Sequence, residues 1–338
     1  MLKLESNIHL KKFNTFGIQA TAKYFVQVPD KSDLLELSHF LKSNQISHLP
    51  RLILGGGSNL IFSQDFHGVV IQPLFDHKGI THTDEDWIYV SAQAGANWNQ
   101  FVHWSLKQNI QGLENLVLIP GSVGAAPVQN IGAYGAEIKD FIQEVEYFDL
   151  ESSTFHVLKN SECRFSYRDS LFKHELKDKA LITEVRFQFP KKPKFKIDYG
   201  ELATMLNPPV TAEKIAQVIT SIRQSKLPDP AIIGNVGSFF HNPIIDSTHA
   251  NKLNLEYPQM PQYKIDSTRV KIPAGWLIDQ CGWKGKSVGN VGVYEKQALV
   301  LVNRGDAKGE EVLHLAKLIQ KSVFDKFQIQ LSIEPIIL

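Results

Sequence analysis

The sequence predicts an α+β fold. Strand-like segments outnumber helical ones, and the two kinds do not follow each other in regular alternation. Residues 180–189 (ALITEVRFQF), for example, alternate apolar and polar side chains as a half-buried strand does. The Gly-rich turn at 55–59 is followed by a strand (GVVIQP), whereas a doubly wound parallel sheet would place a helix after such a turn. These observations favour an α+β fold over a doubly wound sheet.

The first half of the chain carries two predicted helices among several strands. A helix is predicted at 33–44, because Asp33 and Glu36 have the spacing of a capping box. Leucines at 34, 37 and 41 then recur on one face of that helix. The other elements predicted here are strands at 23–29, on both sides of the turn within 51–62, and at 87–96, and a helix at 99–107.

The second half begins with a predicted pair of strands, at 142–150 and 154–158, joined by a turn. A basic, Pro-rich connection follows at 190–209, and a helix then runs from Thr211 until Pro228 stops it. The remaining elements are a helix or loop at 273–284, a strand within 291–302 that ends at Asn303, a helix at 310–326 and a short strand at 329–338.

Composition narrows the functional classes. The 338 residues suffice for two or three domains, and a net charge of +1 provides no strong field for nucleic acid or an anionic membrane. No apolar run is long enough to span a bilayer, and the N-terminus lacks the apolar core of a signal peptide. Cys163 and Cys281 are too few for a disulfide framework, so a cytoplasmic location is expected. The twelve histidines show no HExxH or similar spacing, so no metal site is predicted.

The stretch from Glu114 to Ile138 (ENLVLIPGSVGAAPVQNIGAYGAEI) is dense in glycine and alanine. Few Cβ atoms stand in the way there, so the backbone can approach a ligand closely. A polar ligand would be held by backbone N–H groups and by Ser122, Gln129 and Asn130, and a buried diphosphate fits this chemistry. An ordinary Gly-rich surface loop is an equally weighted alternative.

The turn Gly55-Gly56-Gly57-Ser58-Asn59 has the composition of a phosphate cradle. It lacks the third glycine of the dinucleotide fingerprint, because Leu60 stands there, and it lacks the Gly-Lys-Ser/Thr of a P-loop. On its own, a tight hairpin is the simpler interpretation of this turn.

Six motifs in order resemble one enzyme family. They are Asn14-Thr15-Phe16-Gly17, Leu54 to Asn59, Gly112 to Asn115, Ile119 to Gly135, Tyr167-Arg168-Asp169-Ser170 and Gly237-Ser238-Phe239-Phe240. Together they resemble the UDP-N-acetylenolpyruvoylglucosamine reductases over about 14–334. The resemblance implies reduction of UDP-N-acetylglucosamine enolpyruvyl ether to UDP-N-acetylmuramate, with FAD as cofactor and NADPH as co-substrate. That reaction belongs to peptidoglycan synthesis, and hence to cell-wall biogenesis, cell shape and cell division.

The resemblance also implies a domain plan. It is a two-subdomain FAD-binding fold of the vanillyl-alcohol-oxidase type plus a C-terminal α+β substrate-binding domain. The expected boundaries are 1–65, completed by 327–338, for the first FAD subdomain, 66–227 for the second, and 228–326 for the substrate domain. A monomer is expected.

Three catalytic residues follow from the resemblance. Ser238 matches the family's proton donor, whereas by itself it would be interpreted as a turn or N-cap serine. Arg168 matches the residue that polarises the substrate carboxylate, and its alternative is an ion pair with a carboxylate such as Asp169. Glu334 matches the terminal acid that acts with Arg168, and it would have to be protonated beside developing negative charge. A surface glutamate is its alternative.

Binding residues follow in the same way. Two departures from the family pattern are His241, where lysine is common, and Pro335 directly after Glu334. The resemblance implies a loop over the substrate that carries Tyr199. Substrate and NADPH phosphates are assigned to Tyr199, Lys226, Asn242 and Gln297. FAD is assigned to Gly55, Gly57, Ser58, Asn59, Pro120, Gly121, Ser122, Gly124, Ala125, Gln129, Asn130, Gly132, Ala133 and Arg223.

Two other functions remain open from sequence. One is an FAD oxidase of the same fold that uses O₂, which stable reduced flavin in air would exclude. The other is a flavin- or sugar-nucleotide-binding regulator without turnover. The presence of Arg168, Ser238 and Glu334 at matching positions favours the reductase over both.

Overall fold

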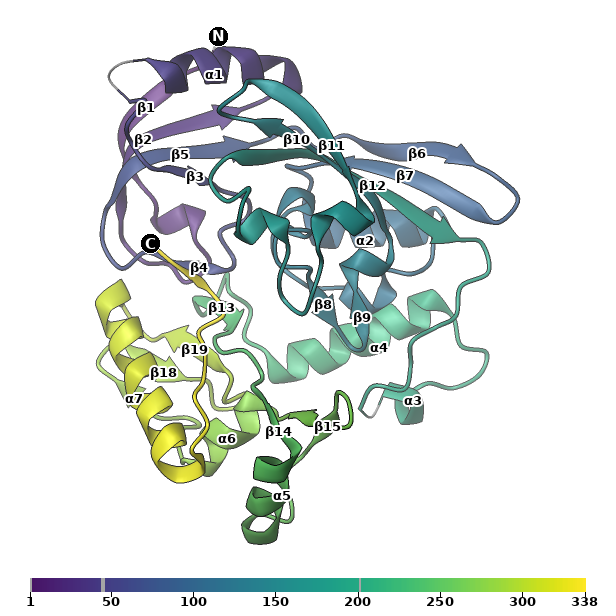
Figure 1. The fold of residues 1–338 in the computed structure, drawn as a ribbon, viewed down its shortest axis with the longest axis vertical. Coiled ribbons are helices and arrows are strands. Elements are labelled where there is room, and N and C mark those ends of the chain that lie inside the picture. Colours follow the sequence, from purple (N-terminus) through teal and green to yellow (C-terminus); the bar gives the residue numbers. More distant parts are fainter. Residues whose placement is uncertain (1, 44–45, 201) are drawn as a thin grey trace. The chain divides into compact units, whose positions relative to one another are not determined.

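The computed structural model describes residues 2–43, 46–200 and 202–338. The chain forms two compact units, which are described separately below (Figure 1). Both contain helices and mainly antiparallel sheets, so the predicted α+β class is confirmed. Unit 1 comprises Met1–Ile8, Ala22–Gly56 and His67–Arg223, and unit 2 comprises His9–Thr21, Gly57–Phe66 and Gln224–Leu338.

The first sheet of unit 1 has the strand order β1-β2-β5-β3. Helix α1 (Leu34–Lys42) buries Leu34, Leu37 and Leu41 in one core with residues of β2 and β5, as the helical spacing predicts. β3 pairs in parallel with β5, and Leu52 lies opposite Val70. The strand bounds are Leu4–His9 for β1, Thr21–Val28 for β2, Phe66–Pro73 for β5 and Arg51–Ile53 for β3.

The predicted capping box of α1 is wrong by one turn. Asp30 forms the cap instead, because its carboxylate accepts a hydrogen bond from the Ser32 N–H at 2.8 Å. The Asp33 carboxylate accepts one from the Asp30 N–H at 3.2 Å, which opens a short 3₁₀ turn before α1. Glu36 accepts from the Leu2 N–H at 3.0 Å. Residue 44, the end of the predicted helix, lies outside the described residues.

The second sheet of unit 1 is antiparallel, in the order β11-β10-β12-β7-β6. The predicted pair at 142–150 and 154–158 is confirmed, with Val145 opposite Leu158. Strand β6 (Lys78–Thr83) was not predicted, because it exposes most of its side chains and shows no clear alternation of apolar and polar residues. The other bounds are Thr154–Lys159 for β11, Ile142–Asp149 for β10, Ala180–Pro190 for β12 and Trp87–Gln93 for β7.

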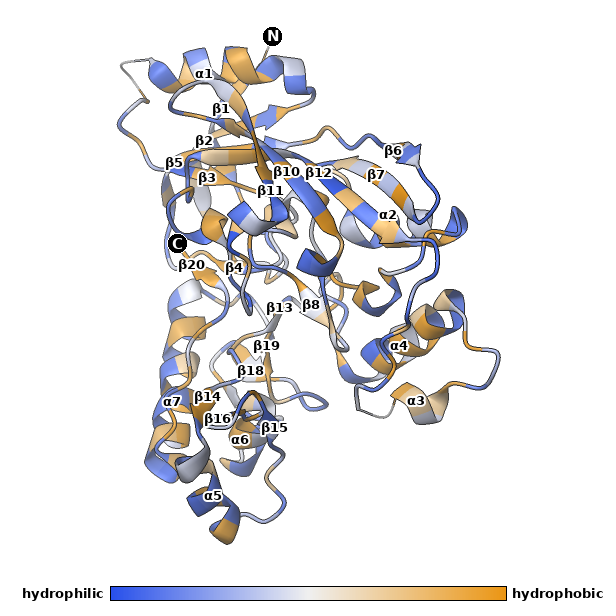
Figure 2. Cartoon of the chain, turned by 45° about the vertical axis from the view of Figure 1, so that its right-hand side comes forward, coloured by the Kyte–Doolittle hydropathy of each residue, from blue (hydrophilic) through white to orange (hydrophobic). Residues whose placement is uncertain are grey.

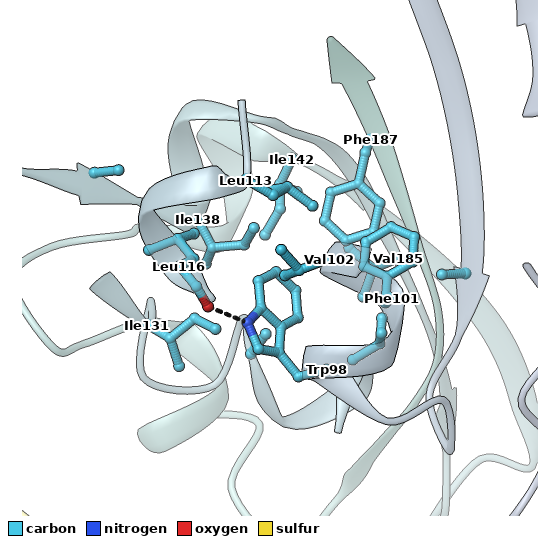
Figure 3. Close-up of a cluster of buried hydrophobic side chains, with 14 of the residues drawn as sticks. Trp98, Phe101, Val102, Leu113, Leu116, Ile131, Ile138, Ile142, Val185 and Phe187 are labelled. Carbon is cyan, nitrogen blue, oxygen red and sulfur yellow. Dashed lines mark hydrogen bonds between the residues drawn. The ribbon is translucent and has the colours of Figure 1, made fainter. Parts of the chain in front are cut away.

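The largest core of unit 1 lies between this sheet, α2 (Trp98–Lys107) and the central Gly-rich stretch. Trp98 is buried in it and donates its indole N–H to the carbonyl of Leu116 at 2.9 Å (Figure 3). The stretch contains the two-stranded ribbon β8 (Gly132–Ala133) and β9 (Ala136–Glu137). Helices α3 (Leu202–Met205) and α4 (Ala212–Lys226) add Leu202, Ile215 and Ile219 to the same core.

Unit 2 is built on the antiparallel sheet β13-β19-β18-β17. Helix α7 (Gly309–Phe327) buries residues at helical spacing from Val312 to Phe327, and the apolar residues recur along it in Figure 2. It contacts α6 (Ala274–Gln280) and β18. The strand bounds are Asn235–Ser238 for β13, Val300–Asn303 for β19, Val291–Val293 for β18 and Ser287–Val288 for β17.

A smaller part of unit 2 consists of the sheet β14-β16-β15 and α5 (Ser247–Glu256). Asp246 caps α5 by accepting from the Thr248 N–H at 2.7 Å. None of these four elements was predicted, because the strands are short and α5 buries only Ala250 and Leu253. The strand bounds are Ile244–Asp246 for β14, Arg269–Lys271 for β16 and Tyr263–Lys264 for β15.

The end of the chain pairs with the strand that follows the Gly-rich turn. β20 (Ile336–Ile337) runs parallel to β4 (Leu60–Ile61), with Ile336 opposite Leu60. β3 and β4, on the two sides of the Gly-rich turn, therefore belong to different sheets. The hairpin interpretation of this turn is wrong.

Candidate active site

Two Gly-rich turns pack against each other in unit 1. A Cβ atom added to Gly55 would lie 2.6 Å from Oγ of Ser122, and one added to Gly56 would lie 2.8 Å from Cα of Gly121. Both distances are shorter than ordinary contacts, so only glycine fits without movement of the neighbour. Sequence alone left an ordinary loop and a tight hairpin open as alternatives for these turns, and the structure shows that the two turns adjoin.

The Ser122 turn is itself anchored to the end of β7. The N–H of Gly124 donates to the carbonyl of Ala94 at 3.0 Å, and the N–H of Val123 donates to that of Ala96 at 2.8 Å. A Cβ on Gly124 would lie 2.5 Å from the Cβ of Ala94. This packing fixes the backbone of the turn, so any ligand would meet an already ordered surface.

The backbone N–H groups of the first turn provide binding capacity. Among the described residues, no acceptor takes a hydrogen bond from the N–H of Gly55 or Gly56. Consecutive N–H groups in a tight turn attract an anion. The two turns together fit the diphosphate of a dinucleotide.

The remaining residues of the first turn lie in unit 2. Gly57 has φ +61°, and its carbonyl accepts from the Thr15 N–H at 3.0 Å. A Cβ there would lie 2.0 Å from the carbonyl oxygen of Phe13, so the position requires glycine for two reasons. The carbonyl of Asn59 accepts from the Ile336 N–H at 3.0 Å, beside the β4–β20 pairing. Ser58 lies between these two anchors.

Asn130 is part of the scaffold of the central stretch. It is fully buried, and its Nδ2 donates to Oε2 of Glu137 at 2.9 Å and to the carbonyl of Ser166 at 2.8 Å. Its Oδ1 accepts from the Lys139 N–H at 3.1 Å. The side chain thus ties this loop to the Tyr167–Arg168 turn, and a ligand contact by Asn130 would use its backbone.

Arg168 has a left-handed backbone, with φ +55°. Its Nη2 donates to the carbonyl of Gly132 at 2.5 Å, and its Nη1 donates to that of Asn130 at 3.5 Å. Asp169 lies 2.9 Å from Nε2 of His174. The guanidinium is therefore oriented by two carbonyls of the central stretch. The same stretch carries most of the residues assigned to FAD.

A second arginine, Arg223, lies near Arg168 at the end of α4. It is half-buried and donates through Nη2 to the carbonyl of Leu118 at 3.2 Å. Burial lowers the pKa of the Arg223 guanidinium below its usual value, and the neighbouring cation Arg168 acts in the same direction, whereas Tyr134 opposes it. Its Nε has no hydrogen-bond partner within the described part of the chain. Two adjacent guanidinium groups of this kind favour an anion.

Tyr134 was missed by sequence reasoning. Burial raises the pKa of its phenol, and its ring meets that of Tyr199 edge to face, with centroids 5.9 Å apart. Tyr199 is 50% exposed, so the predicted substrate tyrosine lies at the surface of unit 1. An aromatic residue between the small residues of the central stretch was the available signal for Tyr134.

Unit 2 carries the other assigned residues. Ser238 is exposed at the end of β13, after Gly237 with φ +71°, and Lys226 is the last residue of α4. Oδ1 of Asn242 accepts from the Ala274 N–H at 2.9 Å. Oε1 of Gln297 accepts from the Leu299 N–H at 3.3 Å. The side-chain oxygens of both amides thus hold local backbone.

Glu334 and His241 lie together in unit 2. Oε2 of Glu334 is 3.6 Å from Nδ1 of His241, and the Glu334 side chain is only 11% exposed. The surface-glutamate alternative for Glu334 is therefore wrong. The structure brings the two Gly-rich turns together in unit 1. It also places Arg168 near Arg223 in unit 1 and Glu334 beside His241 in unit 2.

Comparison with known proteins decides the family. A model described as FAD binding domain matches residues 22–158, and one described as UDP-N-acetylenolpyruvoylglucosamine reductase, C-terminal domain, matches 229–338. A protein of that reductase name from Flavobacterium johnsoniae is 44% identical, over 98% of this chain and 99% of its own. One from Chromobacterium violaceum is 44% identical, over 100% of this chain and 99% of its own. The chain belongs to the UDP-N-acetylenolpyruvoylglucosamine reductase family.

A solved UDP-N-acetylenolpyruvylglucosamine reductase, from Thermus caldophilus, shares the fold. It covers 100% of this chain and 99% of its own, with a TM-score of 0.68 at 22% identity. The predicted fold class, an FAD-binding part followed by a C-terminal α+β domain, is confirmed.

The FAD-binding match includes both turns of the cradle in unit 1, so the residues present fit FAD. Within the described residues, no helix is both long and apolar enough to cross a bilayer.

Proposed function

We propose that this chain reduces UDP-N-acetylglucosamine enolpyruvyl ether to UDP-N-acetylmuramate in peptidoglycan synthesis, with FAD bound and NADPH as reductant. Membership of the reductase family over nearly the whole chain supports the reaction. The observation that carries the proposal is the close packing of the two Gly-rich turns. The N–H groups of Gly55 and Gly56 there favour a diphosphate-bearing cofactor.

FAD, when bound, supplies hydride transfer from NADPH to the vinyl carbon of the sugar. The chain's part is to hold the cofactor through backbone groups of the two turns, with Ser58, Asn59, Pro120, Gln129 and Ala133 as further contacts. Because the turns are fixed by packing against β7 and by the contacts of Gly57, little reorganisation would be needed on binding.

Arg168 would bind the substrate carboxylate. Its guanidinium is held by the carbonyls of Gly132 and Asn130, which supports a preorganised cation. Arg223 stands near it with an incomplete set of hydrogen bonds, and it is assigned to the flavin side of the same region. The two cations would stabilise negative charge that builds up as hydride arrives.

Ser238 would then donate its hydroxyl proton to the carbon next to the one that receives hydride. Its exposure and the open space beside Gly237 support access by a substrate, because a Cβ on Gly237 would meet nothing within 4 Å. Glu334 would act with Arg168 on the enolate-like intermediate. Tyr199, Lys226, Asn242 and Gln297 would hold the phosphates of the sugar nucleotide and of NADPH.

The remaining assignments are also proposals. The proposed domains are 1–65 with 327–338, 66–227 and 228–326. The pairing of β20 with β4 supports the joining of 327–338 to the first of these domains. A cytoplasmic monomer without nucleic-acid or membrane partners is supported by the near-neutral charge of the chain.

The proposal is tested by two separate half-reactions. The purified holoprotein is reduced with NADPH without oxygen, and the flavin absorption is followed while the enolpyruvyl sugar is added. Rapid reoxidation by the sugar supports the proposal. A flavin that is reduced but ignores the sugar would contradict the substrate, and rapid reoxidation by air alone would favour the oxidase.

A further inference from the structure

The segment after β13 lies beside the C-terminal segment in unit 2. The N–H of Glu334 donates to the carbonyl of Phe239 at 3.0 Å, and the N–H of His241 donates to that of Ser332 at 3.0 Å. Phe240 and Ile333 form the antiparallel bridge between these two bonds. Side chains alternate between faces along each strand, so His241 and Glu334 lie on one face as diagonal neighbours.

The side chains of this diagonal pair meet. Nδ1 of His241 lies 3.6 Å from Oε2 of Glu334, and their side chains are 22% and 11% exposed. Solvent and salt therefore screen their interaction less than they screen an exposed pair. When two ionisable groups interact strongly, they titrate as one coupled system, and this contact brings an imidazole within 3.6 Å of a carboxyl group.

We propose that His241 is a positioning residue that holds a proton beside the Glu334 carboxyl group and so sets the net charge of the pair during sugar reduction. This inference rests on the proposed function, in which Glu334 acts with Arg168 on the enolate-like intermediate. With one proton on either of the two side chains, the pair is neutral overall. Without that proton, the pair carries one negative charge and repels the charge that develops on the substrate.

The step needs no other reactant. A single proton resides on the imidazole or on the carboxyl group, no bond to carbon forms at either residue, and neither is oxidised or reduced. Ser238 remains the proposed donor to carbon. His241 acts only through Glu334.

Other titratable groups lie on the neighbouring elements. Asp246 caps α5, and Glu295 pairs with Arg304 at 2.6 Å. Lys271 lies in β16 opposite Ile244, and Lys296 is exposed. The His241–Glu334 contact is a feature of this segment that a change of pH within the imidazole range would alter.

The choice of histidine has a measurable consequence. An imidazole has an ordinary pKa of about 6.5, whereas a lysine ammonium has one of about 10.4. Sugar reduction should therefore decline as the pH rises through the imidazole range, by about tenfold for each pH unit above the midpoint. His241→Lys supplies a cation that persists to higher pH, so that decline should disappear.

The decisive experiment follows the imidazole directly. The holoprotein and the variants Glu334→Gln, His241→Gln and His249→Gln are titrated by NMR of the histidine ring protons. His241→Gln identifies the resonance, and His249→Gln, which removes another histidine of unit 2, is the matched control. Glu334→Gln should shift the His241 midpoint to lower pH and leave the other histidines unchanged. An unshifted midpoint overturns the proposal, whatever the activity.

The second arm measures flavin reoxidation by the enolpyruvyl sugar between pH 5.5 and about 9, a range spanning the imidazole titration. The rate of reoxidation in wild type should decline above its imidazole midpoint, whereas the rate in His241→Lys should stay level. The rate in His241→Gln should stay low until the pH falls to the carboxyl range. Identical profiles in wild type and His241→Lys would overturn the inference. A wild type whose flavin never reacts with the sugar would instead overturn the proposed function, while the NMR result would still decide the coupling.

Discussion

Gly55 and Ser122, which belong to separate Gly-rich motifs, are in direct contact in the folded chain. A Cβ on Gly55 would lie 2.6 Å from the Ser122 hydroxyl oxygen, and the neighbouring Gly56 would meet the backbone of Gly121 at 2.8 Å. The Ser122 hydroxyl can rotate away from an added Cβ, whereas the Gly121 main chain cannot. A substitution at Gly56 should therefore be more damaging than one at Gly55.

Gly56→Ala should lower flavin content more than Gly55→Ala, because the Gly121 main chain cannot move aside without shifting the whole turn. A forced backbone shift of this kind costs about 1–3 kcal/mol. Flavin absorbance per protein and the urea midpoint of unfolding measure both effects. In Gly55→Ala, the further change Ser122→Ala should restore much of the stability, since it removes the obstructing oxygen.

Gly79→Ala is the matched control, because a Cβ there would have 3.8 Å to its nearest neighbour. It should leave flavin content and stability close to wild type. Equal losses in Gly79→Ala and Gly56→Ala would show that the close approach of the two turns does not explain the requirement for glycine.

Ser238→Ala should separate the two half-reactions. NADPH reduces the flavin before the sugar is involved, so this step should remain within about twofold of wild type, whereas loss of a positioned proton donor should slow sugar reduction by about 10²–10⁴-fold. Stopped-flow measurements of each half-reaction provide the test. Ser247→Ala, at the start of α5, is the control. Unchanged sugar reduction in Ser238→Ala would remove Ser238 from the proposed mechanism.

Periodicity predicted most of the fold, because long elements with one buried face leave a clear pattern. α7 and the β10–β11 pair are examples, with bounds close to those expected. The cap of α1 was misplaced because Asp30 and Asp33 have the same capping spacing as Asp33 and Glu36. Local sequence cannot choose between two such boxes, whereas the hydrogen bond from Leu2 to Glu36 involves a residue far away in sequence.

The site was predicted as a set of residue types, and its geometry was not. Small residues made both turns candidates for backbone ligation, but the choice over a hairpin or a surface loop came from the family resemblance. The local sequence does not indicate that the Asn130 side chain forms hydrogen bonds within the protein, or that Tyr134 lies against Tyr199. The contact of His241 with Glu334 depends on pairing between distant segments, and such pairing is invisible to periodicity.

Arg223→Met should stabilise the protein without ligand and weaken the function. Burial disfavours the charged guanidinium, and a methionine of similar length would fill the space without that cost. We expect a gain of about 1 kcal/mol in unfolding free energy together with weaker flavin or substrate binding. Arg164→Met is the control, because Arg164 is an exposed arginine paired with Glu175. Lower stability in Arg223→Met would show that the ligand-free fold already compensates the charge.

Glu114 should make the stability of the protein fall as the pH rises above the carboxyl range. The residue is only 3% exposed, and burial raises its pKa, although the Gly112 N–H donates to its Oε2 at 2.6 Å and opposes the shift. Between the ordinary value of 4.5 and the raised one, the folded state holds a proton that the unfolded state has released. Raising the pH through this window therefore favours unfolding, by up to about 1.4 kcal/mol per pH unit.

Glu114→Gln should remove this slope, because an amide cannot ionise while its oxygen can still accept from Gly112. Urea unfolding of wild type and variant from pH 4.5 upward measures the difference, starting from the ordinary pKa of the group. The stability of Glu114→Gln relative to wild type should rise with pH and then level off above the raised pKa. Glu85→Gln, at an exposed glutamate, controls for the loss of one charge. A relative stability that falls with rising pH would mean that the Gly112 hydrogen bond outweighs burial and that Glu114 is ionised in the fold.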